Sequence, residues 1–292
     1  MVILVVGDVV DDIGVRPLGA VNPASDTISE IRMTPGGSAA NVAAWLGHLG
    51  AQVRFVGRCG ADAVDRHTAA LVQHGVDARI SGDPLLPTAT IVLTLDAVAD
   101  RTMYVDRAAN TSLTEADVPG DVWDDVTWLH VTGYSFFDDG VRPLVLDLVA
   151  EAHRRNVFTS IDPSSLGFLE AVGRDAFRSW IDGIDVIFPN LDEGAYLAGA
   201  ERPDDIADEL SLEVVHVVLT CGADGVFYRG PTGHMAAPAA VVDVVDTTGA
   251  GDAFCAGFLN GLARTHTVEA SLTGGLVAAA RCVALRGARP VA

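Results

Sequence analysis

Short apolar runs alternate with stretches of helical periodicity along most of the chain. The first run, Val2–Val6, is continuously apolar and ends at Gly7, which is typical of a strand buried on both faces. Similar runs predict strands at Val53–Val56, Trp128–Val131, Val157–Ile161, Asp185–Phe188 and Val214–Leu219. Apolar residues at helical spacing predict helices at about 42–49, 62–74, 142–154, 192–198, 251–263 and 271–285.

Strands and helices that alternate in this way predict an α/β fold with a mostly parallel sheet flanked by helices on both faces. The 292 residues are enough for one large domain, or for a core domain with a smaller appendage, and 49% of them are hydrophobic. Ligands of such sheets bind at the carboxyl ends of the strands. We therefore expect functional residues just after the predicted strands.

Two segments do not fit the alternating pattern. Residues from about 13 to 33 lack helical periodicity and contain Pro17, Gly19 and Pro23. Within about 88–108, the runs Thr90–Leu95 and Thr102–Val105 flank the short stretch Asp96–Asp100, which predicts a β-hairpin. We expect the two segments to form a small β-sheet outside the core.

The charged residues exclude several classes of function. The formal net charge is −20, and a strongly acidic surface argues against nucleic acid or an anionic membrane as a partner. All 19 basic residues are arginine, so the chain contains no lysine. It therefore cannot have the lysine of a phosphate-binding loop, the strand lysine of a protein kinase, or a Schiff base.

The remaining composition predicts a cytoplasmic protein. The four cysteines lie far apart without paired spacing, which indicates reduced thiols. No basic segment precedes the first apolar run, so we interpret this run as a buried strand and not as a signal peptide. No apolar run reaches the length of a membrane span.

The segment 245–254 carries the strongest chemical signal. It reads Val-Asp-Thr-Thr-Gly-Ala-Gly-Asp-Ala-Phe and precedes a predicted helix. Its glycines let the backbone N–H groups of Gly249, Ala250 and Gly251 converge on an anion. Asp252 falls in the first helical turn, where the helix N-terminus favours an ionised carboxylate at pH 7 that can accept a proton from a hydroxyl. A glycine turn followed by a capped helix is the alternative.

The residues 246–254 resemble the C-terminal signature of the ribokinase, or PfkB, carbohydrate kinase family. Three further segments resemble motifs of the same family in the same order. They are the glycine motif Gly36-Gly37-Ser38-Ala39-Ala40-Asn41, the Asn-x-x-Glu motif Asn190-Leu191-Asp192-Glu193, and the glycine turn Thr220-Cys221-Gly222-Ala223-Asp224-Gly225. The resemblance covers most of the chain.

The resemblance implies a single ribokinase-like kinase domain over residues 1–292, whose segments 13–33 and 88–108 form a small β lid. The implied activity is transfer of the γ-phosphoryl group of ATP to a hydroxyl of a sugar or sugar-like substrate, with Mg²⁺ and K⁺ as cofactors. A homodimer contact through the lid is also implied. Two alternatives stay open, which are a nucleoside kinase of the adenosine, inosine or pseudouridine type and a non-catalytic ligand-sensing homologue.

The resemblance also implies residue roles at the acceptor end of the site. Asp252 would be the catalytic base and also contact the substrate, and Gly249, Ala250 and Gly251 would form an anion hole. The other implied substrate-binding residues are Asp12, Gly36, Gly37 and Asn41. From the residues alone, Asp12 could instead be a solvated turn carboxylate, which is the less favoured alternative. Arg107 either reaches an anionic or polyhydroxy substrate or lies in a solvated loop.

At the nucleotide end, the implied ATP-binding residues are Asn190, Thr220, Gly222, Gly225, Gly249 and Gly251. Glu193 would organise Mg²⁺ indirectly, and Asp246 and Thr248 would hold the monovalent cation. Asn190 and Glu193 also have the spacing of a helix capping box, and Asp246 could simply cap a turn. An aromatic pocket would favour a nucleoside substrate, and its candidates are Phe55, Tyr104, Tyr134, Phe136 and Phe137.

Overall fold

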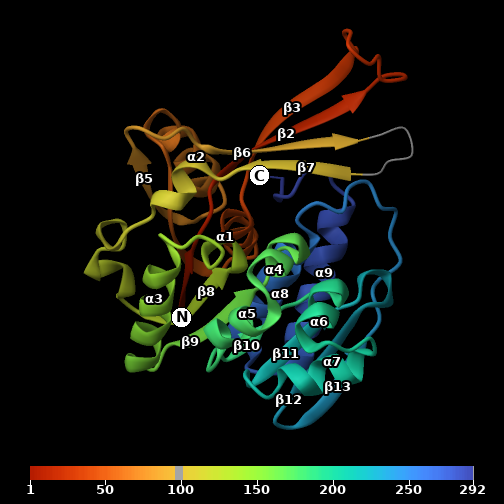
Figure 1. The fold of residues 1–292 in the computed structure, drawn as a ribbon. Coiled ribbons are helices and arrows are strands. Elements are labelled where there is room, and N and C mark those ends of the chain that lie inside the picture. Colours follow the sequence, from red (N-terminus) through yellow and green to blue (C-terminus); the bar gives the residue numbers. More distant parts are fainter. Residues whose placement is uncertain (96–100, 292) are drawn as a thin grey trace.

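A nine-stranded sheet forms the centre of the protein, a computed structural model that describes residues 1–95 and 101–291 (Figure 1). Its strands, in spatial order, are β13 (Gly233–Ala237), β12 (Val226–Gly230), β11 (His216–Thr220), β10 (Val186–Ile187), β9 (Phe158–Asp162), β8 (Val126–Thr132), β1 (Val2–Val6), β4 (Gln52–Gly60) and β5 (Asp77–Asp83). The pairs from β11 to β5 are parallel, and β12 and β13 add antiparallel strands at one edge.

Helices cover both faces of this sheet, because alternate residues of its strands are apolar on both sides. Ile3 and Val5 of β1 pack in one buried cluster with α1 (Ser38–His48), α2 (Val64–Val72), α8 (Ala250–Thr265) and α9 (Val268–Val283). Leu4 and Val6 pack in a second cluster with α3 (Arg142–Arg154), α4 (Leu166–Val172), α5 (Arg174–Ile181), α6 (Leu191–Ala198) and α7 (Pro203–Leu210). Short 3-10 turns lie at Ala61–Ala63, Ala108–Ser112, Glu115–Asp117, Gly120–Trp123, Gly133–Ser135 and Gly222–Asp224.

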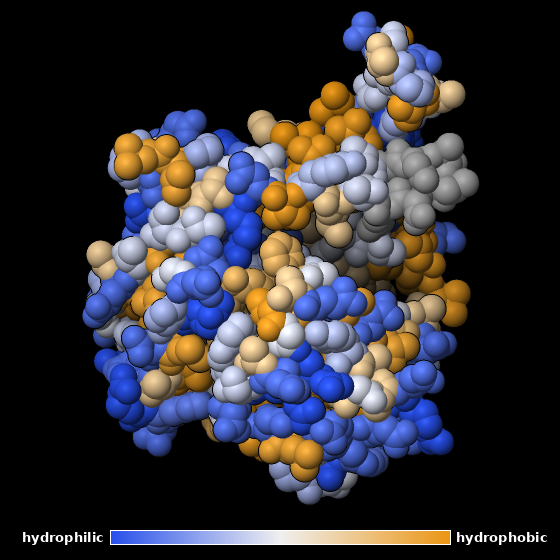
Figure 2. Space-filling model, viewed as in Figure 1, coloured by the Kyte–Doolittle hydropathy of each residue, from blue (hydrophilic) through white to orange (hydrophobic). Residues whose placement is uncertain are grey.

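A separate four-stranded sheet projects from the core as a lid (Figure 1). Its order is β3 (Ser29–Gly36), β2 (Val10–Pro17), β6 (Ala89–Leu95) and β7 (Arg101–Asp106). The β2–β3 and β6–β7 pairs are antiparallel, whereas β2 and β6 are parallel. Figure 2 shows orange, apolar residues near this sheet, and Ile31 and Met33 of β3 are 65% and 64% exposed.

The structure confirms the predicted fold class, which is a mostly parallel sheet with helices on both faces and a small β lid. Each predicted core strand and helix has a counterpart within a few residues. The sequence patterns did not predict β5, β12, β13, α4, α5 and α7, which lie at sheet edges or are short. The predicted hairpin corresponds to β6 and β7, and its turn at 96–100 lies outside the described residues.

None of the described helices has the length and apolar character needed to cross a bilayer. All four cysteines are free, and Cys59, Cys255 and Cys282 are buried.

Candidate active site

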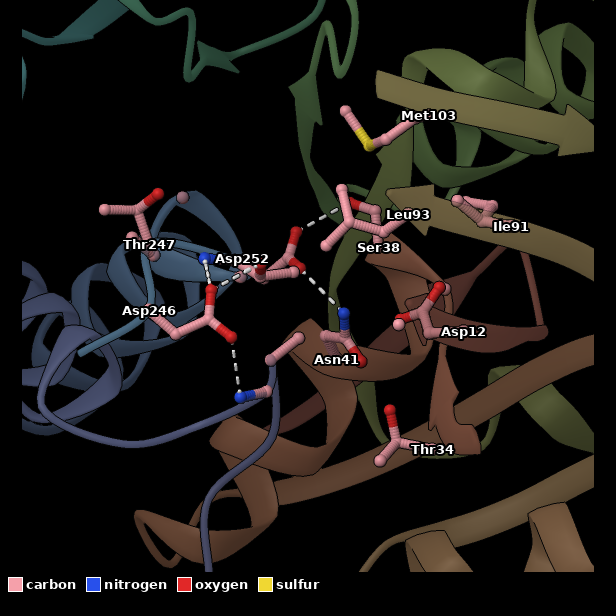
Figure 3. Close-up of a pocket in the computed structure, with 18 of the residues that line it drawn as sticks. Asp12, Thr34, Ser38, Asn41, Ile91, Leu93, Met103, Asp246, Thr247 and Asp252 are labelled. Atoms are coloured by element: carbon pink, nitrogen blue, oxygen red, sulfur yellow. Dashed lines mark hydrogen bonds between the residues drawn. The ribbon is translucent and has the colours of Figure 1, made fainter. Parts of the chain in front are cut away.

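A cleft of about 650 Å³ lies between the carboxyl ends of the core strands and the inner face of the lid. Its floor includes Asp8 after β1, Asp162 at the end of β9, and the segment 245–252 that leads into α8. Its roof comes from lid strands, whose Ile91, Leu93 and Met103 point toward the cleft (Figure 3). The cleft therefore has the position expected for a ligand site in a parallel sheet.

Asp252 lies in the first turn of α8 and is held by two side chains of α1. Its Oδ1 accepts a hydrogen bond from Ser38 Oγ at 2.7 Å, and its Oδ2 accepts one from Asn41 Nδ2 at 2.9 Å (Figure 3). Asp252 and Asn41 are 211 residues apart in the sequence. Close packing of α1 against α8 thus brings the two predicted motifs into one site.

Burial raises the pKa of the Asp252 carboxyl to about 7, and the nearby charge of Asp162 adds to that increase. The hydrogen bonds from Asn41 and Ser38 act in the opposite direction. Our expectation that the helix N-terminus keeps Asp252 fully ionised at pH 7 is therefore wrong. The loss of hydration outweighs the helix dipole, whose effect is only about 0.3–1 kcal/mol at exposed sites.

Gly249 begins α8 in a left-handed conformation, with φ of +76°. A Cβ built at this position would lie 2.6 Å from the Cβ of Ala288, so a larger residue does not fit here. Gly249, Ala250 and Gly251 all line the cleft. The first N–H groups of a helix lack intrahelical partners, and Ala250 N makes one long hydrogen bond, to the carbonyl O of Thr247 at 3.3 Å. Such a turn fits the anion hole that we expected here.

Asp246 connects this turn to the end of the chain. Its Oδ1 accepts hydrogen bonds from Thr248 N at 2.9 Å and from Thr248 Oγ1 at 2.7 Å. Its Oδ2 accepts one from Gly287 N at 3.0 Å. The predicted pair Asp246 and Thr248 is thus adjacent and lines the same cleft as Gly249, Ala250 and Gly251.

Asp12 lies across the cleft from Asp252, close to the glycine motif (Figure 3). A Cβ at Gly36 would be 2.0 Å from Asp12 Oδ2, and one at Gly37 would be 2.5 Å from the carbonyl O of Asp8. Both glycines therefore permit close approach of a carboxylate or the main chain. Burial raises the pKa of Asp12 to about 7, with the charge of Arg289 opposing the shift.

Asn190 and Glu193 form a capping box at the start of α6. Asn190 Oδ1 accepts from Glu193 N at 2.9 Å, and Glu193 Oε2 accepts from Asn190 N at 3.0 Å. Both residues also line the cleft. Burial raises the pKa of Glu193 to about 7. Burial and the Glu193 charge raise the pKa of Asp162 to about 8.

Four predicted residues do not line the cleft, and one of them is Gly36, which directly precedes the lining residue Gly37. Arg107 donates from Nη2 to the carbonyl O of Tyr134 at 2.5 Å, and it is Tyr134 that lines the cleft. Gly222 and Gly225 lie just beyond Thr220, which does line it. Gly225 has a φ of +100°, and a Cβ there would be 2.1 Å from the carbonyl O of Ala237.

Sequence reasoning missed several residues of the site. Asp8 accepts from Ser38 N at 2.7 Å and from Ala39 N at 3.0 Å, and thus fixes the start of α1. Asp8 and Asp162 each follow a predicted strand, so their positions at strand ends could have revealed them. Arg289, which donates to Asn41, had no comparable signal because it lies in a segment with no predicted element.

Comparison with known proteins agrees with this geometry. The chain matches the pfkB family carbohydrate kinase profile over residues 2–291. It is 32% identical over 266 residues to a fructokinase of Escherichia coli, covering 86% of this chain and 85% of that protein. It is 28% identical over 253 residues to an aminoimidazole riboside kinase of Salmonella typhimurium, covering 82% and 76%.

The fold is similar to several solved structures. A probable sugar kinase from Rhizobium etli aligns over 99% of this chain and 95% of its own, with a TM-score of 0.88 at 23% identity. A Vibrio cholerae fructokinase with fructose, ADP and potassium ion bound aligns over 98% and 93%, with a TM-score of 0.80 at 24% identity. A proposed ribokinase II from Escherichia coli, in complex with ATP and Mg²⁺, aligns over 98% and 94%, with a TM-score of 0.87 at 24% identity.

The chain belongs to the pfkB family of carbohydrate kinases. It is a sugar or nucleoside kinase, which is a phosphotransferase with an alcohol group as acceptor.

Proposed function

We propose that this protein is an ATP-dependent sugar kinase with Asp252 as its catalytic base and an anion hole at Gly249–Gly251. The observation that carries the proposal is the position of the Asp252 carboxylate. It lies in the cleft at the start of α8, oriented by Ser38 and Asn41 and adjacent to the glycine turn. A base beside a set of backbone N–H donors is the arrangement that phosphoryl transfer to a hydroxyl needs.

In the proposed reaction, Asp252 accepts the proton of the acceptor hydroxyl while the hydroxyl oxygen forms a bond to the γ-phosphorus. The bond between that phosphorus and the β–γ bridging oxygen breaks, and ADP leaves. The N–H groups of Gly249, Ala250 and Gly251 stabilise the negative charge on the transferring oxygens. The product is a phosphorylated sugar, and the proton on Asp252 is released to solvent.

The acceptor end of the cleft favours a polyhydroxy ligand. Among the described residues, none donates a hydrogen bond to the Asp12 carboxylate, so Asp12 can accept from sugar hydroxyls. Asn41 and the closely approached main chain at Gly36 and Gly37 would complete this end. Arg107 would act behind it, by fixing the carbonyl of Tyr134.

The aromatic residues favour a sugar over a nucleoside. Phe55 and Phe136 have no exposed surface and belong to the core. Tyr104 is 62% exposed and neighbours Met103 along β7, so it points away from the cleft that Met103 lines. Of the five candidates, only Tyr134 lines the cleft, and the roof above it is aliphatic. A purine base would therefore lack an aromatic sandwich under the described part of the lid.

Thr220, Asn190, Gly222 and Gly225 are the proposed ATP-binding residues beside the anion hole. For Mg²⁺, no cluster of three or more potential ligands is preformed among the described residues. The buried carboxyls Asp162 and Glu193 fit a role in organising the ion, because the Glu193 charge disfavours ionisation of Asp162 and a cation would relieve this. Mg²⁺ also keeps waters and phosphate oxygens as ligands, and when bound it offsets phosphate charge.

We also propose a K⁺ site at Asp246 and Thr248. The site would brace the loop before the anion hole without touching the acceptor. Activity with Mg²⁺ should therefore be higher in K⁺ than in a bulky organic cation of equal ionic strength. Equal initial rates in the two salts would rule the site out.

The lid would close over the acceptor and could join two chains as a homodimer. Its outer face carries one apolar row, formed by Met33, Ile13, Val92 and Tyr104 in register across four strands. A cytoplasmic location is consistent with the four free cysteines. The acidic composition gives no reason to expect a nucleic acid or membrane partner.

A coupled assay of ADP release with a panel of sugars, sugar phosphates and nucleosides tests the proposed function. We expect turnover with a hexose or pentose that exceeds turnover with any nucleoside. Asp252→Asn is the matched control, because it preserves shape and removes the base. A nucleoside as the best acceptor would overturn the sugar assignment. Ligand binding without any ADP release would instead support the non-catalytic sensing role.

A further inference from the structure

The residues just after α9 contact three parts of the active site in turn. Gly287 N donates to Asp246 Oδ2 at 3.0 Å, and the carbonyl O of Ala288 accepts from Trp45 Nε1 at 2.9 Å. Ala288 also packs directly on Gly249 of the anion hole. These contacts fix residue 289 beside the first turn of α1.

Arg289 donates two hydrogen bonds at this position. Its Nε donates to Asn41 Oδ1 at 3.0 Å, and its Nη2 donates to the carbonyl O of Gly36 at 2.8 Å. Asn41 Nδ2 donates in turn to Asp252 Oδ2. A guanidinium can only donate and an ionised carboxylate can only accept, so a single orientation of the Asn41 amide satisfies both neighbours. Arg289, Asn41 and Asp252 thus form a directed chain of hydrogen bonds.

The charge of Arg289 also acts on the acidic groups of the cleft. Burial lowers the pKa of Arg289 to about 10, and the charges of Asp12, Asp252 and Asp8 oppose this decrease. Its Nη1 is buried and has no hydrogen-bond partner among the described residues. A buried cation of this kind stabilises the ionised forms of neighbouring carboxyls.

The positive charge of Arg289 offsets negative charge among the groups around Asp252. Those that face Asp252 or interact with its charge are Asp8, Asp12, Ser38, Asn41, Tyr134, Asp162, Cys255, Cys282 and Arg289. All of these except Arg289 are neutral or acidic. The charge of Arg289 also acts on two histidines, and burial lowers the pKa of His67 to about 4 and also lowers that of His74. Neither histidine therefore adds a positive charge at neutral pH.

We propose that Arg289 is a positioning residue for phosphoryl transfer, which aligns Asp252 through Asn41 and favours its ionised form through charge. The inference rests on the proposed role of Asp252 as the base. Arg289 does not line the cleft, so it acts through Asn41 and not on the acceptor. In a chain without lysine, this arginine offsets part of the negative charge that Asp8, Asp12, Asp162 and Asp252 bring to one end of the cleft.

The test compares Arg289→Gln and Arg289→Lys with wild type, using Arg54→Gln as a matched control. Arg54 is also a largely buried arginine, whose side chain is 15% exposed, and it donates to Asp77 and to the carbonyl O of Val122 far from the cleft. For each protein, kcat and KM for acceptor and ATP, the pH profile of kcat/KM, and the melting temperature are measured.

We expect Arg289→Gln to lower kcat about 10- to 100-fold, as misaligned catalytic groups do, with little change in KM for ATP. Its acid limb of kcat/KM should move to higher pH, because the ionised form of Asp252 loses a favourable charge. Arg289→Lys should lower kcat but leave the acid limb of kcat/KM at the same pH. Lysine keeps the positive charge but lacks the guanidinium fork. Arg54→Gln should lower the melting temperature without changing kcat or the limb.

An unchanged kcat and acid limb in Arg289→Gln would overturn the inference, as would an equal loss of kcat in Arg54→Gln. If Arg289→Gln does not fold, Arg289→Lys decides by the same measurements, and an unchanged kcat in that variant overturns the inference. If the proposed function itself is wrong, Asp252→Asn will retain turnover. Both the catalytic role of Asp252 and the positioning role of Arg289 are then excluded. If Asp252→Asn loses turnover but Arg289→Gln keeps the wild-type kcat and acid limb, only the positioning role of Arg289 is excluded.

Discussion

The core sheet and the lid sheet differ in strand pairing and in what covers them, because the core is mostly parallel and the lid is mostly antiparallel. Strands of the core sheet are buried on both faces, and residues such as Leu4, Val5 and Leu129 have no exposed surface. Among the described residues, no helix layer covers the lid sheet, and most residues of β3 are exposed. Buried apolar area is the main source of local stability, so the lid should open at a lower free-energy cost than the core.

This difference separates two tasks within one cleft. The groups proposed for chemistry, Asp252 and the anion hole, lie at the carboxyl ends of the rigid core strands and on helices packed on them. The lid contributes Asp12 and an aliphatic roof, which can move without disturbing that geometry. Closure of the roof would exclude water, which otherwise competes with the sugar for the phosphoryl group.

The largest effect is expected from Asp252→Asn on the core side. Losing a general base typically lowers kcat about 10²–10⁴-fold, whereas acceptor binding should change far less because asparagine still hydrogen-bonds a hydroxyl. The measurements are kcat by coupled assay and Kd by calorimetry. A variant that kept more than about a tenth of wild-type kcat would show that Asp252 is not the base.

Replacing a leucine by alanine should lower the free energy of unfolding more in the core sheet than in the lid sheet. Leu129→Ala in β8 should lower the free energy of unfolding by about 2–5 kcal/mol, because Leu129 is fully buried. Leu93→Ala in the lid should cost at most about 1 kcal/mol, since the side chain is only half-buried. Leu93→Ala should instead raise KM for the acceptor. Denaturant unfolding and steady-state kinetics measure both effects, and equal destabilisation would contradict the comparison.

The pH dependence of stability should reveal the buried carboxyls of the core. Asp252 has its pKa raised from 3.8 to about 7 in the folded protein, so the folded state binds its proton more tightly than the unfolded state does. The contribution of this group is therefore present below pH 4 and is lost as pH rises to 7. The melting temperature of Asp252→Asn should fall less than that of wild type between pH 5 and 8. If the melting temperatures of Asp252→Asn and wild type changed equally between pH 5 and 8, the raised pKa of Asp252 would be refuted.

The smallest effect is expected in hydrogen exchange. Binding of an acceptor with an ATP analogue should increase protection in β2, β3 and β6 of the lid, while strands β1 and β8 should change little because they are already protected. Unchanged exchange in all three lid strands would mean that the lid does not close over the ligand.

The sequence was sufficient to predict the fold and most of the cleft, because both depend on local patterns. Continuous apolar runs identified the buried strands, and the glycine motifs placed Gly37, Gly249 and Asp252 where the structure brings them together. The lid was recognised from two segments that do not follow the core pattern, one of which carries a β-hairpin signal. Its strands extend to Val10 and Gly36, beyond the predicted segment 13–33.

Features that depend on distant contacts could not be predicted. The raised pKa of Asp252 follows from burial and from the charges of Asp162 and Asp8, which no local pattern encodes. Arg107 carries a charge that suited a substrate contact, yet its guanidinium is directed to the carbonyl of Tyr134. The edge strand β5 has few apolar residues, because pairing with β4 and not burial holds it in the sheet.

The order in which the active-site residues are synthesised has a consequence for folding during translation. Asp12 and Asn41 leave the ribosome early. Asp252 follows 211 positions after Asn41. The hydrogen bonds of Arg289 to Asn41 and Gly36 can form only after that. At synthesis rates of about 5–20 residues per second, the early α1 waits roughly ten seconds or more for its partners. A nascent chain should therefore acquire its complete acceptor site only after the segment around Arg289 has left the ribosome.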